Sequence, residues 1–178
     1  MVQLRDKVSP IGRLLPVARD LCRLAREAGV TFIVNDRVDL ALAVDADGCH
    51  VGQNDLPTQV ARRLLGRNRI LGVSSHSLAE ALQAEADGAD YLAVGSIFPT
   101  RTKSEFQLVG LDLLTQARQK CSLPLVAIGG ITLENVSEVI RAGADGAAVI
   151  SAIGGAEDPE RATQQFIEAV RKAKATVS

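Results

Sequence analysis

The chain has 178 residues, and its 47% hydrophobic and 23% charged residues are typical of a globular domain with a buried core. Twenty Lys and Arg residues against 21 Asp and Glu residues give a net charge of −1, so the chain has no overall field to attract nucleic acid or an anionic membrane. Only 3% of the residues are aromatic and no apolar run reaches the length of a membrane span, so we expect a single domain over residues 1–178 with neither nucleic acid nor a membrane as its partner.

Short apolar runs alternate with helical stretches along the whole chain. The predicted strands cover residues 2–5, 32–35, 48–51, 70–73, 91–95, 125–128 and 147–150. Each run is followed by a loop, a helical stretch and then the next run. This alternation predicts βα units that form a parallel sheet.

Two of the predicted helices carry clear start or stop signals. Apolar residues at spacings of three and four, from Leu14 to Ala28, give one apolar face, and Gly29 then suits a C-terminal cap. Ser77 followed by Glu80 has the spacing of a capping box. Both patterns predict helices of the length that a βα unit needs.

The later helices have signals of the same kind. Thr132 is expected to cap a helix that runs to about Gly143, and Pro159 after Asp158 suits the first turn of the last helix. Residues 86–94 and 142–149 resemble each other, and each pattern indicates a helix end, a tight turn and a strand. The similarity supports a repeated βα unit.

The number of units bears on the fold class. We count seven βα units, whereas a (β/α)₈ barrel has eight. The predicted fold is therefore α/β, a TIM (β/α)₈-type barrel with seven visible units and the first strand missing, or else a sheet that does not close.

Polar residues or glycines follow all seven predicted strands. The groups are Arg5, Asp6 and Lys7; Asn35, Asp36 and Arg37; residues 52–55; Ser74, Ser75 and His76; residues 100–103; Gly129 and Gly130; and Ser151. In βα folds the chemistry lies past the carboxyl ends of the strands. These groups are therefore expected at one rim.

The charged members of this set indicate an anion and metal site. Arg5, Lys7 and Lys103 are cations that can bind phosphate oxygens. Asp36 and Asp55 follow neighbouring strands and form a suitable pair for Mg²⁺ shared with a diphosphate. Each carboxylate alone is also a plausible helix cap. The prediction of a metal site therefore depends on both carboxylates lying at the same rim.

A second anion site is predicted further along the chain. Gly129 and Gly130 stand before a helix and would offer free N–H groups to a phosphate. Ile150 and Ser151 end the last predicted strand, where such barrels often hold phosphate. We expect two anionic ligands, a diphosphate with Mg²⁺ and a monophosphate.

The cysteines and the first residues indicate the compartment. Cys22, Cys49 and Cys121 are widely spaced and form no CxxC pair, which is typical of small buried residues in a reducing cytosol. Residues 1–7 lack the long apolar core of a signal peptide. We expect a cytoplasmic protein.

Seven stretches match one known family in the family's order. They are VQLRDK at 2–7, IVNDR at 33–37, HVGQND at 50–55, GVSSH at 72–76, FPTRTK at 98–103, IGGI at 128–131 and VISAI at 149–153. On these stretches the chain resembles the thiamine phosphate synthase family. The resemblance implies a TIM-barrel transferase that joins a hydroxymethylpyrimidine diphosphate to a thiazole phosphate, giving thiamine phosphate and pyrophosphate.

The resemblance also implies roles for individual residues. The pyrimidine diphosphate would be bound by Gln3, Leu4, Arg5, Asp6, Lys7, Asn35, Ser74 and Lys103. The thiazole phosphate would be bound by Thr100, Arg101, Thr102, Gly130, Ile150 and Ser151. Asp36 and Asp55 would hold Mg²⁺, and the residues expected to be catalytic are Arg5, Lys7, Ser74 and Lys103.

The family's mechanism is dissociative, so pyrophosphate would leave before the thiazole nitrogen attacks. Cations and Mg²⁺ would stabilise the leaving group, and little general base chemistry is needed. The partners implied are these two small molecules, and self-association to a homo-oligomer is left open.

Family members begin with a further strand and helix before Gln3, which accounts for the count of seven. Two alternatives follow. One is the related thiazole tautomerase, with His76 as acid–base, although it would have no use for the paired Asp36 and Asp55. The other is a truncated, non-catalytic phosphate-binding barrel.

Overall fold

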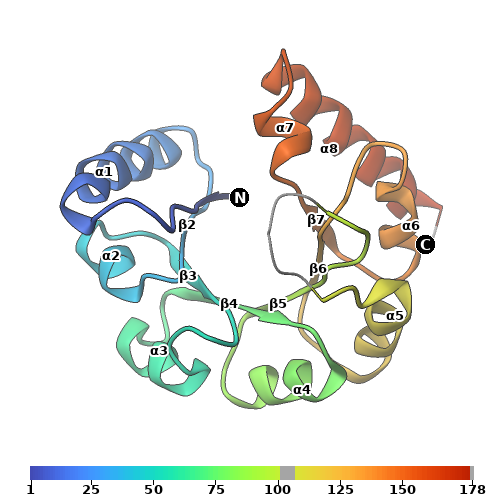
Figure 1. Ribbon diagram of the computed structural model, residues 1–178, viewed down its shortest axis with the longest axis horizontal. Helices are drawn as coiled ribbons and strands as arrows, with labels where there is room; N and C mark the ends of the chain where they lie inside the picture. Colours follow the sequence, from blue (N-terminus) through green and yellow to red (C-terminus); the bar gives the residue numbers. More distant parts are fainter. Residues whose placement is uncertain (101–106, 177–178) are drawn as a thin grey trace. The chain divides into compact units, whose positions relative to one another are not determined.

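The computed structural model describes residues 1–100 and 107–176, and within them strands and helices alternate (Figure 1). The strands are β1 (Val2–Leu4), β2 (Phe32–Asn35), β3 (Gly48–Val51), β4 (Ile70–Ser75), β5 (Tyr91–Val94), β6 (Leu125–Ile128) and β7 (Gly146–Ala148). The helices are α1 (Ile11–Glu27), α2 (Val38–Ala43), α3 (Thr58–Leu65), α4 (Leu78–Ala86), α5 (Gly110–Lys120), α6 (Val136–Arg141), α7 (Ser151–Gly154) and α8 (Pro159–Ala175). The predicted α/β class and its seven βα units are confirmed.

The chain divides into two compact units, and the first contains residues 1–74 and 84–90. In it β1, β2, β3 and β4 pair in chain order, all parallel. Helices α1, α2 and α3 lie along one side of these strands (Figure 1). All four residues of β3 are buried, as are Phe32, Ile33 and Val34 of β2. Such continuous burial, with His50 as the one polar side chain among these seven residues, is expected for parallel strands that are covered on both faces.

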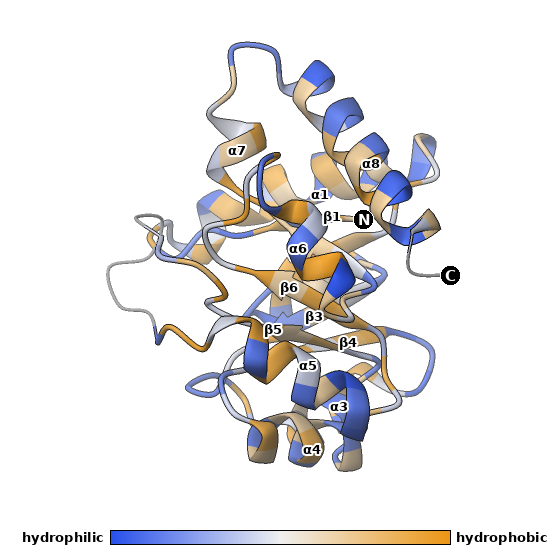
Figure 2. Ribbon diagram, turned by 90° about the vertical axis from the view of Figure 1, so that its right-hand side faces the viewer, coloured by the Kyte–Doolittle hydropathy of each residue, from blue (hydrophilic) through white to orange (hydrophobic). Residues whose placement is uncertain are grey.

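The second unit contains residues 75–83 and 91–178. Here β5, β6 and β7 pair in chain order, again parallel. Helix α8 carries alternating polar and apolar patches along its length (Figure 2). Its apolar residues Ala162, Phe166 and Ala173 are buried, and it packs on α6. None of the helices in the described ranges is long and apolar enough to cross a membrane.

Most of the predicted helix signals are found in the structure. Gly29 follows α1 with φ of +64°, and the Asp158 carboxylate accepts the Arg161 N–H at 2.9 Å, capping α8. Ser77 Oγ accepts the Glu80 N–H at 3.2 Å, while the Glu80 carboxylate accepts the His76 N–H at 2.6 Å. The Glu80 side chain therefore reaches one residue further back than in the standard capping box.

Three expectations were wrong in detail. Helix α6 begins at Val136, so Thr132 is not its cap. Strand β4 continues to Ser75, which places Ser74 inside a strand. Strand β7 ends at Ala148, so Ile150 lies outside it. Ile150 directly precedes α7, and its carbonyl accepts the Gly154 N–H at 2.8 Å.

An aspartate stands directly before three of the strands and accepts a hydrogen bond from an earlier strand. The bonds run from the N–H groups of Phe32 to Asp47 (2.7 Å), of Leu71 to Asp90 (2.7 Å) and of Leu125 to Asp145 (2.8 Å). Each aspartate also donates its own N–H to the carbonyl of the same residue. The double contact, here called the aspartate clamp, satisfies the first backbone groups of both strands.

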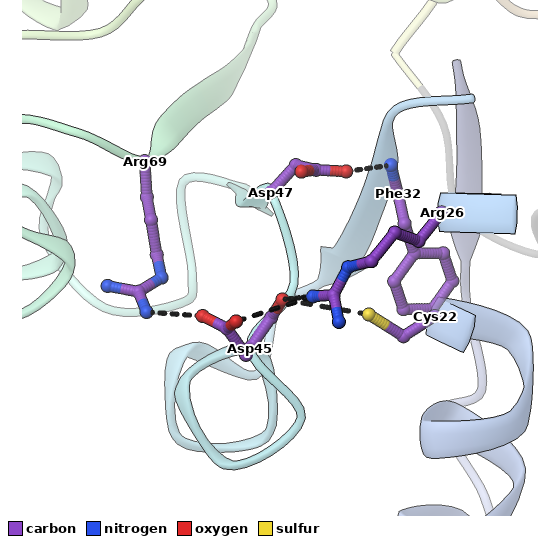
Figure 3. Close-up of polar contacts among 6 residues, drawn as sticks. All are labelled: Cys22, Arg26, Phe32, Asp45, Asp47 and Arg69. Atoms are coloured by element: carbon purple, nitrogen blue, oxygen red, sulfur yellow. Dashed lines mark hydrogen bonds and ion pairs between the residues drawn. The ribbon is translucent and has the colours of Figure 1, made fainter. Parts of the chain in front are cut away.

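Arginines brace the turns beside these clamps. The Asp45 carboxylate lies between Arg26, at 3.3 Å, and Arg69, at 2.8 Å (Figure 3). The backbone carbonyl of Asp45 accepts a hydrogen bond from Cys22 Sγ. Asp45 has a left-handed backbone, with φ of +55°. Asp adopts this conformation more readily than most residues, and the two arginines offset the local charge.

We predict that Asp47→Ala lowers the free energy of unfolding by about 1–2 kcal/mol, because the Phe32 N–H loses its acceptor in a partly buried place. Asp47→Asn is the matched control, since its amide oxygen can accept the same bond. Urea unfolding of both variants measures the difference. Equal losses in the two variants would contradict a role for the hydrogen bond.

Candidate active site

In the first unit, the predicted site residues follow the carboxyl ends of four paired strands. Arg5, Asp6 and Lys7 follow β1, Asp36 follows β2, and Asp55 follows β3, while Ser74 lies near the end of β4. The parallel pairing brings these strand ends to one edge of the sheet.

The loop after β1 presents two cations on either side of a fixed carboxylate. Asp6 Oδ1 accepts the N–H groups of Val8 and Ser9, each at 2.8 Å, and these bonds lower the pKa of Asp6. The Asp6 carboxylate is thus occupied in holding the loop. Arg5 is exposed, and Lys7 Nζ lies 2.9 Å from Asp36 Oδ2.

Asp36 sits in a left-handed backbone conformation, with φ of +63°. Its N–H donates to the His50 carbonyl at 2.7 Å, which ties the end of β2 to β3. The next residue, Arg37, is held by a two-bond ion pair with Asp39 at 2.9 and 2.7 Å, which lowers the pKa of Asp39. Residues in sparsely populated backbone regions concentrate at functional sites, and here the conformation presents Asp36 to Lys7.

Asp55 is a half-buried carboxylate beside Asp36. Its Oδ2 accepts the Gly52 N–H at 2.7 Å. Burial raises the pKa of Asp55, and the neighbouring Asp36 carboxylate raises it further, while the Gly52 bond and Lys7 oppose the change. The two carboxylates are therefore close enough to repel each other.

Ser74 is fixed by two side chains from the β3 region. Its Oγ lies 2.8 Å from His50 Nε2, and its carbonyl accepts from Gln53 Nε2 at 2.6 Å. His50 is buried in β3 and is not among the site residues expected from the sequence. It is paired with Gly72 of β4, and its ring reaches Ser74, two residues further along that strand, a contact that the order of residues in the sequence does not reveal.

The donor set of this unit fits one Mg²⁺ ion. Mg²⁺ takes oxygen ligands and commonly uses one or two carboxylates, with waters and substrate phosphates completing its shell. Asp36 and Asp55 are such a pair, and a cation between them would relieve their repulsion. Among the described residues no cluster of three or more His, Cys, Asp or Glu side chains has metal-binding geometry.

In the second unit, the glycine pair after β6 forms a tight backbone turn. Gly130 has φ of +63°, and a Cβ at this position would collide with the Pro99 carbonyl. Asn135 holds the turn, because its Nδ2 donates to the Gly130 carbonyl at 3.0 Å and its Oδ1 accepts the Thr132 N–H at 2.8 Å. Asn135 was not predicted from the sequence, where Thr132 was expected only to cap the following helix.

The remaining predicted positions of this unit are only partly described. Ile150 and Ser151 are exposed, at the start of α7, and Thr100 follows β5. Arg101, Thr102 and Lys103 lie outside the described residues. His76, the acid–base of the tautomerase alternative, is engaged by Glu80, whose carboxylate lies 3.4 Å from its Nδ1.

Parallel βα units with cations, carboxylates and glycines past the strand ends define the class of TIM-type α/β enzymes that handle phosphorylated substrates. A family model described as thiamine monophosphate synthase matches residues 1–153 of this chain. The chain therefore belongs to the thiamine monophosphate synthase family, and it is a transferase.

Individual relatives agree with this assignment. A thiamine-phosphate synthase from Chloroflexus aurantiacus is 55% identical over 93% of this chain and 77% of its own length. One from Moorella thermoacetica is 52% identical over 97% of this chain and 83% of its own length. The solved structure of a thiamine phosphate pyrophosphorylase from Pyrococcus furiosus is 44% identical and has a TM-score of 0.89, covering 96% of this chain and 82% of its own.

We predict that Asp55→Asn stabilises the substrate-free protein near neutral pH by up to about 1 kcal/mol. Because the pKa of Asp55 is raised on folding, its ionisation works against the folded state, and the wild type loses this stability as the pH rises through that pKa. The Asn amide oxygen can keep the Gly52 bond.

The measurement is urea unfolding of both proteins from pH 3 to pH 7 without divalent metal. The gap between them should close below the ordinary Asp pKa of 3.8, where Asp55 is neutral in both states. A gap that stays constant with pH would show that the carboxylate charge is not the cause.

Proposed function

We propose that this chain joins 4-amino-2-methyl-5-hydroxymethylpyrimidine diphosphate to a thiazole phosphate, giving thiamine phosphate and pyrophosphate. The observation that carries the proposal is the cluster of Lys7, Asp36 and Asp55 at adjacent strand ends, with Arg5 exposed beside it. One cation paired with two carboxylates suits a diphosphate bound together with a divalent metal. The names of the relatives support the same reaction.

The proposed metal is Mg²⁺, held by Asp36 and Asp55. When bound, it would neutralise the negative charge that develops on the departing diphosphate. Arg5 and Lys7 would bind the diphosphate oxygens from the loop after β1, whose shape Asp6 maintains. Lys103 is assigned the same role from its place in the sequence. The pyrimidine half would be held by Gln3, Leu4, Asn35 and Ser74.

The proposed reaction is a dissociative substitution. The bond between the pyrimidine methylene carbon and the diphosphate oxygen breaks, and the electron pair leaves with pyrophosphate. The lone pair of the thiazole nitrogen then forms the new carbon–nitrogen bond. No proton has to be moved in either step, so cations and alignment can supply the catalysis.

The thiazole phosphate is assigned to the second unit. The backbone N–H groups of the turn at Gly129 and Gly130, which Asn135 holds through the Gly130 carbonyl, would bind the phosphate. Ile150, Ser151 and Thr100 would complete the site, together with Arg101 and Thr102. The proposed location is cytoplasmic, in keeping with three free, buried cysteines.

A single end-point assay tests the proposal. The protein is mixed with the pyrimidine diphosphate, thiazole phosphate and Mg²⁺, and the product is oxidised to fluorescent thiochrome. We expect signal with Mg²⁺ and none with EDTA. A folded protein without signal would contradict the synthase and favour the tautomerase or a binding protein, and signal that survives EDTA would contradict the metal.

Asp36→Asn tests the division of the site. Asn tolerates the left-handed backbone of this position, so stability should change by less than about 0.5 kcal/mol. We expect Mg²⁺-dependent turnover to fall about 100-fold or more, since a metal ligand is lost.

Thiazole phosphate affinity, measured by calorimetry, should stay unchanged in the same variant. Asp36→Ala is the comparison, because it removes the charge and also strains the backbone. Loss of thiazole phosphate affinity in Asp36→Asn would contradict the assignment of the two substrates to separate groups of residues.

A further inference from the structure

His50 occupies a central place in the first unit that none of the assigned roles uses. It lies in β3, opposite Asn35 of β2 and Gly72 of β4, and only 6% of its surface is exposed. Because side chains alternate along a strand, its ring points away from the side taken by Cys49 and Val51. A buried polar ring in a strand needs hydrogen-bond partners, and its partners define what it does.

The contacts of His50 join two parts of the proposed pyrimidine diphosphate site. Its ring Nε2 lies 2.8 Å from Ser74 Oγ, and its carbonyl accepts the Asp36 N–H at 2.7 Å. One residue therefore holds both the serine hydroxyl and the loop with the proposed metal carboxylate. Gln53 holds the Ser74 carbonyl, so the backbone and the side chain of Ser74 are fixed separately.

We infer that His50 is a positioning residue, which sets the direction and the hydrogen-bonding role of the Ser74 hydroxyl. The inference rests on the proposed function, in which Ser74 touches the pyrimidine substrate. A free serine hydroxyl turns among several orientations, and a fixed partner selects one before the substrate arrives.

The tautomer of His50 decides what Ser74 offers to the substrate. If Nε2 carries no proton, the Ser74 hydroxyl donates to the ring, and its oxygen is left to accept from an N–H group such as the pyrimidine amine. If Nε2 is protonated, the ring donates to Ser74, and the serine proton is left for a substrate oxygen. Either arrangement gives Ser74 one defined role in place of two.

A matched pair of variants tests the positioning role. The amide of His50→Gln reaches close to the place of Nε2, whereas the shorter amide of His50→Asn does not. We expect His50→Asn to lower kcat about 10- to 100-fold, as losses of supporting hydrogen bonds commonly do, with the thiazole phosphate KM unchanged. His50→Gln should restore most of the rate.

A double-mutant cycle separates positioning from a structural effect. If His50 acts through Ser74, then Ser74→Ala/His50→Asn should be no slower than Ser74→Ala alone. The inference would be overturned if the double variant lost rate by the product of the two single losses. Equal losses in His50→Gln and His50→Asn would also overturn it. Urea unfolding of the same variants shows whether a change in stability explains the rates.

A second readout needs no activity. The chain has only two histidines, so ¹⁵N-histidine labelling gives few ring signals, and His76→Gln identifies those of His50. Ser74→Ala should shift the Nε2 resonance of His50 and leave His76 unaffected, and the wild-type shifts report the tautomer. An unchanged His50 signal in Ser74→Ala would overturn the inference.

The two readouts also separate this inference from the proposed function. A wild-type protein that makes no thiamine phosphate would overturn the synthase, and with it the kinetic role of His50. The His50–Ser74 coupling would then still be seen by NMR. Activity in the wild type together with an unshifted His50 signal would overturn the positioning role alone.

Discussion

The aspartate clamp is the interaction on which the placement of the candidate site depends. Asp47 exchanges two hydrogen bonds with Phe32, which fixes where β3 begins relative to β2. Three residues further along both strands, the same register sets Asn35 opposite His50. A shift of one residue would turn every side chain of the strand to the other face, so Asp36 and Ser74 could not both contact His50.

The clamp aspartate occurs in three similar turns, but only two of them resemble each other in sequence. Residues 86–94 and 142–149 share a glycine, an alanine and a clamp aspartate, and both glycines have positive φ. Before β3, Asp45 stands at the place of that glycine, with φ of +55°, and Arg26 and Arg69 hold its carboxylate. Sequence similarity between the copies is lost there, although the backbone turn is the same.

The alternation of apolar runs and helices was enough to predict the α/β class and the approximate positions of the strands, because buried parallel strands are largely apolar. Residues that follow strands could likewise be grouped from their order alone. The contacts between them could not, since the pairing of Lys7 with Asp36, or of His50 with Ser74, depends on register and on backbone conformation. Asn135 and the engagement of Arg37 by Asp39 were missed for the same reason.

The electrostatics of the first unit fit a reaction that moves a leaving group and no protons. The whole chain is nearly neutral, so a diphosphate would be attracted only by a local field. Lys7 supplies part of that field but is paired with Asp36, while Asp36 and Asp55 repel each other. A divalent cation would satisfy both carboxylates and release the Lys7 ammonium toward the diphosphate. Metal and diphosphate would therefore support each other's binding, because the metal frees the Lys7 ammonium that the diphosphate needs.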